Sequence, residues 1–209
     1  MTDSDVAARG RRLSPHTRRG EILAAARKLF SERPYTSVST ADVAEAAGVA
    51  RSLVHHYFGG IRELFFAVVA QGGTALADLR SAGPETPLEE RLAYNVAAAL
   101  DVIDANRETW LAAAVYGASI DDPDIRQLVA ALTDRQVDRM LTANSDVISD
   151  TPTTRHALRC FVAFATEATR QWVAGEHTRE ETEALLVTAF RNLLLSTIPA
   201  LEAGAGPAA

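Results

Sequence analysis

The amino-acid sequence predicts an all-α fold of about nine helices. Helix-start signals recur along the chain, apolar residues follow a helical period, and strand signals are absent. Neither alternating β-branched runs nor Asn-Gly or Asp-Gly hairpin turns occur. The predicted helix starts, each with a capping side chain before a proline or three residues before a glutamate, are Ser14-Pro15, Thr86-Pro87, Asp122-Pro123, Thr151-Pro152 and Thr178.

The predicted helices form two domains between two tails. Residues 1–13 and 203–209 are small, polar and aperiodic, which predicts a disordered basic arm and a disordered tail. The domains are expected at residues 14–60 and 61–202. A helix that begins near Ile61 contains Gly72-Gly73, and each glycine costs roughly 1 kcal/mol relative to alanine inside a helix. The pair therefore indicates either a bend or an early helix end.

The composition is that of an ordinary globular protein, with 47% hydrophobic and 23% charged residues among 209. No apolar run reaches the ~20 residues of a membrane span, and the N-terminus lacks the apolar stretch of a secretory signal. The single cysteine, Cys160, excludes an internal disulfide and fits a reducing compartment. We expect a cytoplasmic protein without a membrane partner.

Charge is distributed unevenly along the chain. Residues 1–62 hold ten Lys and Arg against six Asp and Glu, a net charge of +4. The remaining residues hold eleven basic and twenty-one acidic side chains, a net charge of −10. A basic N-terminal part on an acidic body indicates a polyanionic partner for the N-terminal part alone.

The stretch from Val38 to Leu64, VSTADVAEAAGVARSLVHHYFGGIREL, predicts two short helices across a glycine turn. Ser39 is placed to cap the first helix, which ends at Gly48, the residue best able to adopt a left-handed turn conformation. The second helix, from about Ala50 to Phe58, buries Val54 and Phe58 at i, i+4 spacing. Two helices in this arrangement form a helix-turn-helix, whose second helix enters the DNA major groove.

The same stretch resembles the DNA-binding head of the TetR family of transcriptional regulators. The resemblance rests on TADVAEAAGV at residues 40–49, Phe58, Glu63-Leu64 and the upstream helix EILAAARKLF, and it covers about residues 18–66. It implies a three-helix DNA-binding domain followed by a helical ligand-binding and dimerisation domain. The implied function is that of a repressor that binds a palindromic DNA operator as a homodimer and is released by a small molecule.

The resemblance also implies roles for individual residues of the head. Ser39 and Thr40 would contact phosphate, and Ala50, Arg51 and Ser52 would open the recognition helix, from which Arg51 can reach a guanine edge. The expected DNA-binding set is completed by Arg18, Arg19, His55, His56 and Tyr57. Ile61 departs from the family pattern because it occupies the position of a phosphate-contacting lysine.

The adjacent histidines have two other interpretations. Neighbouring helical side chains point about 100° apart, so His55 and His56 do not chelate one ion, and we expect neither a metal nor a cofactor. Packing in the core remains open for His56. Catalytic arrangements such as Ser-His-Asp, a phosphate-binding glycine loop or His-x-x-x-His are absent, which argues against an enzyme.

The body is expected to supply a dimer interface and an effector pocket. Apolar residues on more than one face of its last two long helices indicate burial on several sides, which fits either a dimer or a monomer with a wide core. The resemblance implies that these helices form the dimer interface, with contacts through Phe161, Ala165, Trp172, Leu186, Ala189 and Leu193. The aromatic residues indicate an apolar or aromatic effector, with polar contacts from Asn95, Asn106 or Gln171. The predicted pocket residues are Tyr94, Asn95, Trp110, Tyr116, Phe164 and Gln171. An alternative is a body that docks a partner protein and binds no small molecule.

Overall fold

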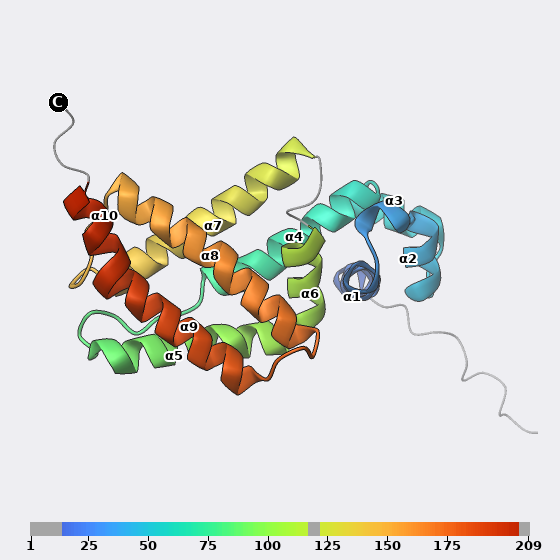
Figure 1. Cartoon of the computed structure of the whole chain (residues 1–209). Helices are drawn as coiled ribbons and strands as arrows, with labels where there is room; N and C mark the ends of the chain where they lie inside the picture. The colour runs from blue at the N-terminus through green and yellow to red at the C-terminus, as the bar shows by residue number, and fades with distance from the viewer. Residues whose placement is uncertain (1–13, 117–121, 205–209) are drawn as a thin grey trace, which may run out of the picture. The chain divides into compact units, whose positions relative to one another are not determined.

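The computed structural model describes residues 14–116 and 122–204, and this part of the chain is helical without strands (Figure 1). The all-α prediction is confirmed, with nine helices in the described residues when the continuous helix Arg179–Gly204 counts once. The N-terminal elements are α1 (Pro15–Glu32), the 3₁₀ turn Tyr35–Ser37, α2 (Thr40–Ala46), α3 (Arg51–Phe58) and α4 (Ile61–Ala77).

The later elements complete an exclusively helical body. They are α5 (Leu88–Ala105), α6 (Arg107–Leu111), a π-helical turn (Ala112–Tyr116), α7 (Pro123–Ala143), α8 (Pro152–Val173), α9 (Arg179–Asn192), a second π-helical turn (Leu193–Thr197) and α10 (Ile198–Gly204). Ala203 and Gly204, expected in the tail, extend α10. The expected arm at 1–13 and the rest of the tail lie outside the described residues.

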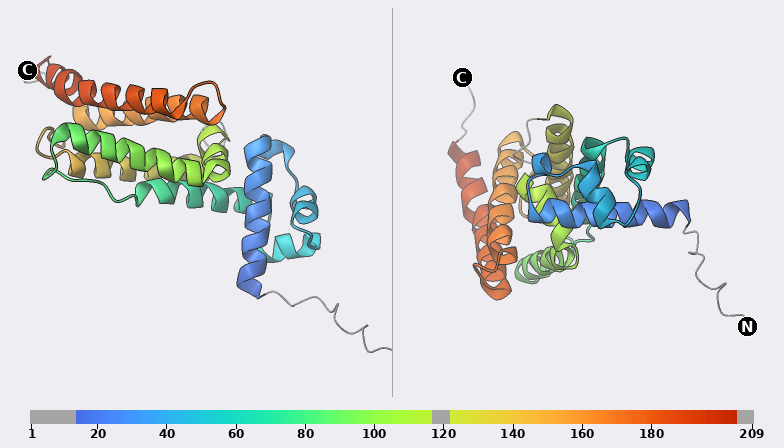
Figure 2. Two further views of the ribbon diagram at one scale, coloured as in Figure 1. Left: turned by 90° about the horizontal axis from the view of Figure 1, so that it is seen from below. Right: turned by 90° about the vertical axis from the view of Figure 1, so that its right-hand side faces the viewer.

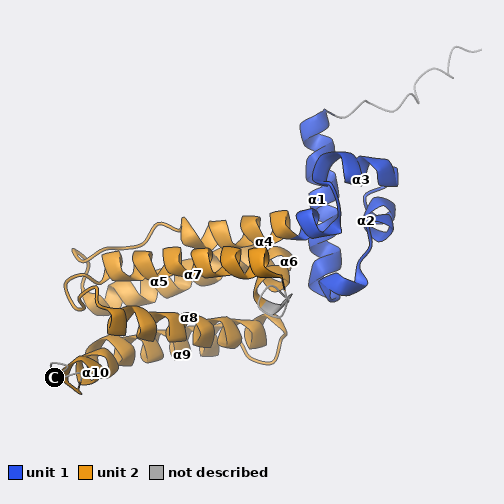
Figure 3. Ribbon diagram, turned by 90° about the horizontal axis from the view of Figure 1, so that it is seen from above, with its two compact units in different colours: residues 1–65 blue, residues 66–209 orange. Residues whose placement is uncertain are grey.

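The chain separates into two compact units, Met1–Phe65 and Phe66–Ala209 (Figure 3). The division falls inside α4, a few residues after the boundary expected at residue 60. Each unit has its own buried apolar side chains. In the first unit, Ile22, Ala26 and Phe30 from α1 are completely buried, and the ring of Phe30 meets that of Phe65 edge-on at 5.0 Å between centroids.

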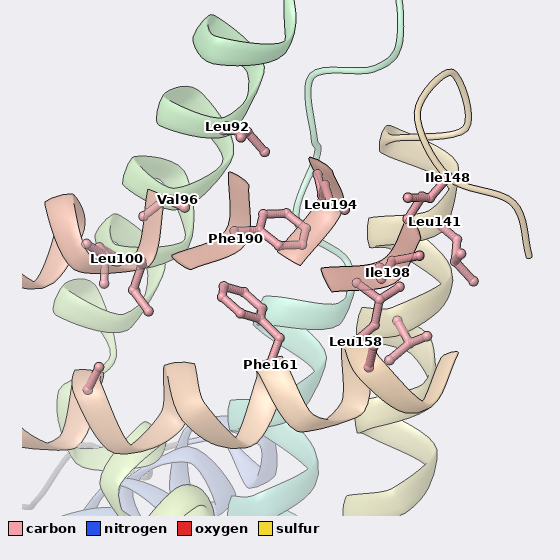
Figure 4. Close-up of a cluster of buried hydrophobic side chains, with 14 of the residues drawn as sticks. Leu92, Val96, Leu100, Leu141, Ile148, Leu158, Phe161, Phe190, Leu194 and Ile198 are labelled. Atoms are coloured by element: carbon pink, nitrogen blue, oxygen red, sulfur yellow. The ribbon is translucent and has the colours of Figure 1, made fainter. Parts of the chain in front are cut away.

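The second unit is organised around α5, α8 and α9. Helix α9 packs along both α5 and α8, and α8 also packs along α7, as the views in Figures 1 and 2 agree. Between α8 and α9 the rings of Phe161 and Phe190 stack with centroids 4.6 Å apart (Figure 4). Leu92, Val96 and Leu100 project from α5 into the same cluster.

Most of the predicted helix starts are confirmed by side-chain caps. Ser14, Asp122, Thr151 and Thr178 each accept a hydrogen bond from a backbone N–H in the first turn, and Thr178 forms a capping box with Glu181. The predicted cap at Thr86 is wrong. Helix α5 begins one residue later than the Thr86 cap requires, with Pro87 as the N-cap and no side-chain cap.

The glycine pair neither bends nor ends its helix, because α4 runs through it to Ala77. A Cβ atom at Gly72 would lie 3.0 Å from the backbone oxygen of Thr109, and one at Gly73 would lie 2.2 Å from a methyl carbon of Leu132. The pair therefore lets α4 approach α6 and α7 more closely than any larger residue permits.

The C-terminal helical run Arg179–Gly204 is apolar in composition. It is long and apolar enough to cross a membrane by these two measures alone, with 22% of its most apolar window buried within this chain. The sequence-based expectation missed this run because Arg191 interrupts its apolar residues. Its large exposed side chains include Leu185, Leu195 and Leu201.

Candidate DNA-binding face and effector cavity

The start of α2 and the turn between α2 and α3 have the conformations that the sequence predicts. The Ser39 hydroxyl accepts the Asp42 N–H at 3.2 Å, and Asp42 Oδ2 accepts the Ser39 N–H at 2.7 Å, which completes a capping box. Val38 and Val43 are both buried across this helix start. Gly48 has φ 63°, the left-handed conformation that the turn requires.

Helix α3 has one buried and one exposed face. Val54 and Phe58 are buried, which holds the helix against the rest of the head. The predicted DNA-contacting side chains Arg51, Ser52, His55 and His56 are all exposed, as is the N-cap Ala50, and Tyr57 is half-buried. The helix therefore presents several hydrogen-bonding side chains on the face that does not pack.

Three of the predicted DNA-binding residues contact one another. Arg51 Nε donates to Thr40 Oγ1 at 2.9 Å, and His55 Nε2 lies 3.4 Å from the same hydroxyl. His55 Nδ1 is in addition 3.0 Å from the carbonyl oxygen of Gly59. Thr40 is only 6% exposed, so its hydroxyl links the start of α2 to α3 and orients Arg51.

At the start of α2, the hydrogen-bonding groups of Ser39 that were expected to contact phosphate are already bonded to Asp42. The Ser39 hydroxyl donates to Asp42 Oδ2 at 2.8 Å, so the capping box already uses it. Hydrogen bonds from the Ser39 N–H and hydroxyl, followed by the charge of Arg33, lower the pKa of Asp42. A phosphate contact at Ser39 and Thr40 therefore falls to the backbone N–H groups of the first turn, which helix starts offer to anions.

The other expected DNA-contacting cations are partly used within the head. Arg18 Nη1 lies 3.0 Å from Glu21 Oε2, and the Arg19 guanidinium lies 4.7 Å from the centre of the Phe58 ring. Arg19 nevertheless remains exposed. Ile61 is half-buried at the first position of α4 and offers no charge there.

The second unit contains a partly open apolar cavity of about 100 Å³ lined by residues of α4, α5, α6, α7, α8 and α9. Its walls include Leu100, Ile103, Trp110, Phe161 and Phe190. A neighbouring hollow of about 400 Å³ is lined by Val69, Gly72, Gly73, Leu132 and others. Leu76, Trp110, Gln136, Val162 and Thr166 line both spaces.

Of the five predicted pocket residues whose side chains the structure describes, only Asn95 and Trp110 line the cavity. Tyr94 and Phe164 are exposed at 56% and 42%, because their positions on α5 and α8 face away from the core. Gln171 lines neither space and donates to Glu167 instead. The side chain of Tyr116 lies outside what the structure describes.

The three expected polar contacts for an effector are already engaged. Asn95 exchanges two hydrogen bonds with the backbone of Ala82, and Asn106 donates to the carbonyl oxygen of Val102. The polar wall residues that sequence reasoning missed are Ser81, Gln136, Arg139, Asn144, Thr166 and Thr169. Leu132, Gln136, Arg139 and Ala143 recur at spacings of four, three and four, so a charge on the inward stripe of α7 was the available signal.

Comparison with known proteins agrees with the geometry of the head. Residues 22–68 match the sequence model of the bacterial regulatory proteins of the tetR family. The transcriptional activator FasR of Mycolicibacterium smegmatis is 25% identical over 184 residues, which are 85% of this chain and 82% of that protein. Residues 22–68, the head of this chain, therefore belong to the TetR family by this match.

Two further similar proteins show how much of the chain the similarity covers. The regulator BetI of Brucella anthropi is 34% identical over 111 residues, but the match spans 50% of this chain and 57% of BetI. A tetR-family regulator from Streptomyces coelicolor, of known crystal structure, has a TM-score of 0.71 at 27% identity, covering 87% of this chain and 82% of that one. The chain is therefore a transcriptional regulator of the TetR type.

The residues expected at a dimer interface of this TetR-family regulator have two different environments. Phe161, Trp172 and Leu186 are buried in the core of the chain, and Ala165, Ala189 and Leu193 pack partly against it. The large exposed apolar side chains on the same helical run and on α8 are Phe164, Leu185, Leu195 and Leu201. Periodicity could not distinguish the core-facing from the outward-facing stripes of these helices.

Metal ligation has no support in the described part of this TetR-family chain. No group of three or more His, Cys, Asp or Glu side chains there is placed to hold an ion. The Cys160 sulfur is exposed and lies 3.9 Å from His156 Nε2.

Proposed function

We propose that this regulator is a homodimeric repressor in the cytoplasm that binds a palindromic operator and releases it when a small apolar effector binds. The observation that supports DNA recognition best is the exposed face of α3, where Arg51 and His55 lie beside the Thr40 hydroxyl. Arginine reads guanine O6 and N7 in the major groove, and histidine can donate to a phosphate oxygen. Repression follows from occupying the promoter and needs no further contact surface.

The exposed apolar residues of the C-terminal helices support a dimer. Phe164, Leu185, Leu195 and Leu201 would cost free energy in water, since burying a leucine contributes about 1.5–3 kcal/mol. A second copy of α8 and of the run Arg179–Gly204 would cover them in a two-fold arrangement. Two heads related by such an axis read the two halves of a palindrome.

The cavity supports a small-molecule effector over a body that only docks a protein. It is concave and mostly apolar, which is typical of ligand sites. Helix α4 begins in the first unit, and its later residue Leu76 lines the cavity. An effector releases DNA only if it binds the DNA-incompetent state more tightly, because equal affinity for both states shifts no population.

A mobility-shift assay with DNA flanking the gene of this regulator tests the proposal. We expect a sequence-selective complex at moderate salt that Arg51→Ala weakens, and dissociation of the complex when the effector is found among added metabolites. Deletion of the gene should raise expression from the bound promoter. A selective complex combined with reduced expression on deletion would show an activator, and absence of any selective complex would contradict the proposal.

A further inference from the structure

Two residues that line the cavity each have one buried polar atom without a hydrogen-bond partner in the protein. These atoms are Arg139 Nε and Asn144 Oδ1. Leaving such an atom unpaired costs about 1–3 kcal/mol, so native proteins rarely tolerate it without a function or a bound molecule. One hydrogen-bond donor and one hydrogen-bond acceptor of the residues that line this cavity are therefore not paired within the protein.

Arg139 differs from other arginines of α7 and α8. Arg135, Arg155 and Arg159 all pair with aspartates. Among the described residues no carboxylate pairs with Arg139, whose Nη1 donates only to the Ser81 hydroxyl at 2.7 Å. Burial lowers the pKa of Arg139, but a guanidinium stays protonated at neutral pH. The cavity wall therefore contains a positive charge without a counter-ion.

Asn144 supplies a second and independent observation. It is the C-cap residue of α7 and is only 1% exposed. Its Nδ2 donates to the carbonyl oxygen of Met140 at 2.8 Å, which fixes the amide with Oδ1 unpaired. Because Oδ1 is an acceptor, it calls for a hydroxyl or N–H donor from a molecule inside the cavity.

We propose that the cavity binds an apolar organic acid, whose carboxylate receives the free N–H of Arg139 and whose hydroxyl, where present, donates to Asn144. A charged hydrogen bond of this kind compensates a desolvated guanidinium, and a neutral ligand cannot do so. The apolar part of the acid packs against Trp110, Phe161 and Phe190 and extends into the neighbouring hollow of about 400 Å³. This inference names the chemical class of the effector and so rests on the proposed function.

Isothermal titration calorimetry on the full chain tests the acid preference with two matched pairs, octanoate against 1-octanol and 4-phenylbutyrate against 4-phenyl-1-butanol. We expect the acid of at least one pair to bind about 10- to 100-fold more tightly than its alcohol, the range of one charged hydrogen bond. Arg139→Gln should reduce this ratio to about threefold or less. Arg135→Gln, one turn earlier on α7 and lining neither space, should leave the ratio unchanged.

The proposed contact between a ligand hydroxyl and Asn144 is tested by comparing two acids with and without a hydroxyl group. 3-Hydroxyoctanoate should bind more tightly than octanoate to the unaltered chain and equally tightly to Asn144→Leu. Circular dichroism of each variant confirms that it is folded. Equal affinity for acid and alcohol, an acid preference that survives Arg139→Gln, or no binding of any probe would overturn the inference.

Release of DNA is measured separately by fluorescence anisotropy of the operator complex. Arg139-dependent binding of acid without release would support the ligand class and contradict the effector role. Release by a neutral compound while acids fail to bind would contradict the ligand class and leave the effector role standing. The two proposals can therefore fail independently.

Discussion

At the scale of single residues, Gly72 is required because a Cβ atom at this position would clash with a neighbouring helix. Glycine lowers helix stability by roughly 1 kcal/mol relative to alanine, so its presence inside α4 needs a reason. That reason is the backbone oxygen of Thr109, 3.0 Å from where a Cβ would stand. Backbone cannot move aside as a flexible side chain does, so the contact favours glycine over the better helix former.

Gly72→Ala should therefore destabilise the protein by about 1–2 kcal/mol, because overpacking costs about 1–3 kcal/mol and outweighs the gain in helix propensity. Gly20→Ala is the matched control, since Gly20 lies inside α1 with no atom within 4 Å of an added Cβ. The control should stabilise by about 0.5–1 kcal/mol. Urea unfolding measures both changes, and stabilisation by Gly72→Ala would contradict the packing of α4 against α6.

Arg91 is a second residue whose role is structural. It is completely buried, its Nη1 donates to the carbonyl oxygens of Gly83 and Thr86, and its Nη2 lies 2.9 Å from Asp146 Oδ1. It therefore ties the segment before α5 to the turn before α8. The sequence contained no sign of this, because one arginine in an acidic helix start looks like a solvent-exposed residue.

Replacing Arg91 by methionine should cost about 2–4 kcal/mol, since two carbonyls and one carboxylate lose a charged donor. Arg135→Met is the control, because Arg135 and its partner Asp78 are both half exposed and such pairs contribute about 0–1 kcal/mol. The melting temperature of each variant gives the comparison. Equal losses for the two arginines would show that the burial of Arg91 contributes nothing.

At the scale of elements, the helix-turn-helix of the head could be predicted from the sequence, whereas the residues that line the cavity of the body could not. The capping box at Ser39, the turn at Gly48 and the buried pair Val54 and Phe58 are local features, so residues a few positions apart specify them. The cavity gathers side chains from six helices, α4 to α9, and its charge, Arg139, lies on the inward stripe of α7. Local spacing gives no information on which helices meet across a core.

Arg51→Ala should weaken binding to the operator about 5- to 100-fold while leaving the affinity for unrelated DNA nearly unchanged, because a base contact carries about 1–3 kcal/mol of discrimination. The Thr40 hydroxyl, which accepts from Arg51, orients that contact. Fluorescence anisotropy on both DNAs gives the ratio. A parallel loss on the two DNAs would assign Arg51 to phosphate instead of a base.

Ile61→Lys should add one phosphate contact at the start of α4, where the present chain has an aliphatic side chain. The slope of log K against log salt should become steeper by about one. Binding titrations at four or more salt concentrations measure the slope. An unchanged slope would mean that the first residue of α4 does not face DNA.

At the scale of the whole molecule, the proposed binding to a palindromic operator requires two copies of the chain. One copy has a mass of 22.4 kDa and leaves Leu185 and Leu195 about half exposed on its C-terminal helical run. The multiple apolar stripes of α8 and of the C-terminal run are the basis of the proposed interface. It could not assign Phe161 and Trp172 to the core, because both stripes of a buried helix have the same period.

Light scattering coupled to size-exclusion chromatography should give a mass of about twice that of one chain. Leu185→Asp together with Leu195→Asp should shift the mass toward one chain, since a carboxylate inside an apolar interface is strongly unfavourable. Tyr94→Ser is the control, because Tyr94 is exposed on α5, outside the proposed interface. A dimer that tolerates both aspartates would place the interface elsewhere.

The central claim is that the chain recognises a specific DNA sequence through α3. Selection of bound sites from a random duplex library, followed by anisotropy titration at about physiological salt, tests it most directly. The account predicts a palindromic consensus that binds about 10³-fold or more tightly than a scrambled duplex, and a ratio that falls with Arg51→Ala. Enrichment of no consensus, or a ratio near one, would contradict it.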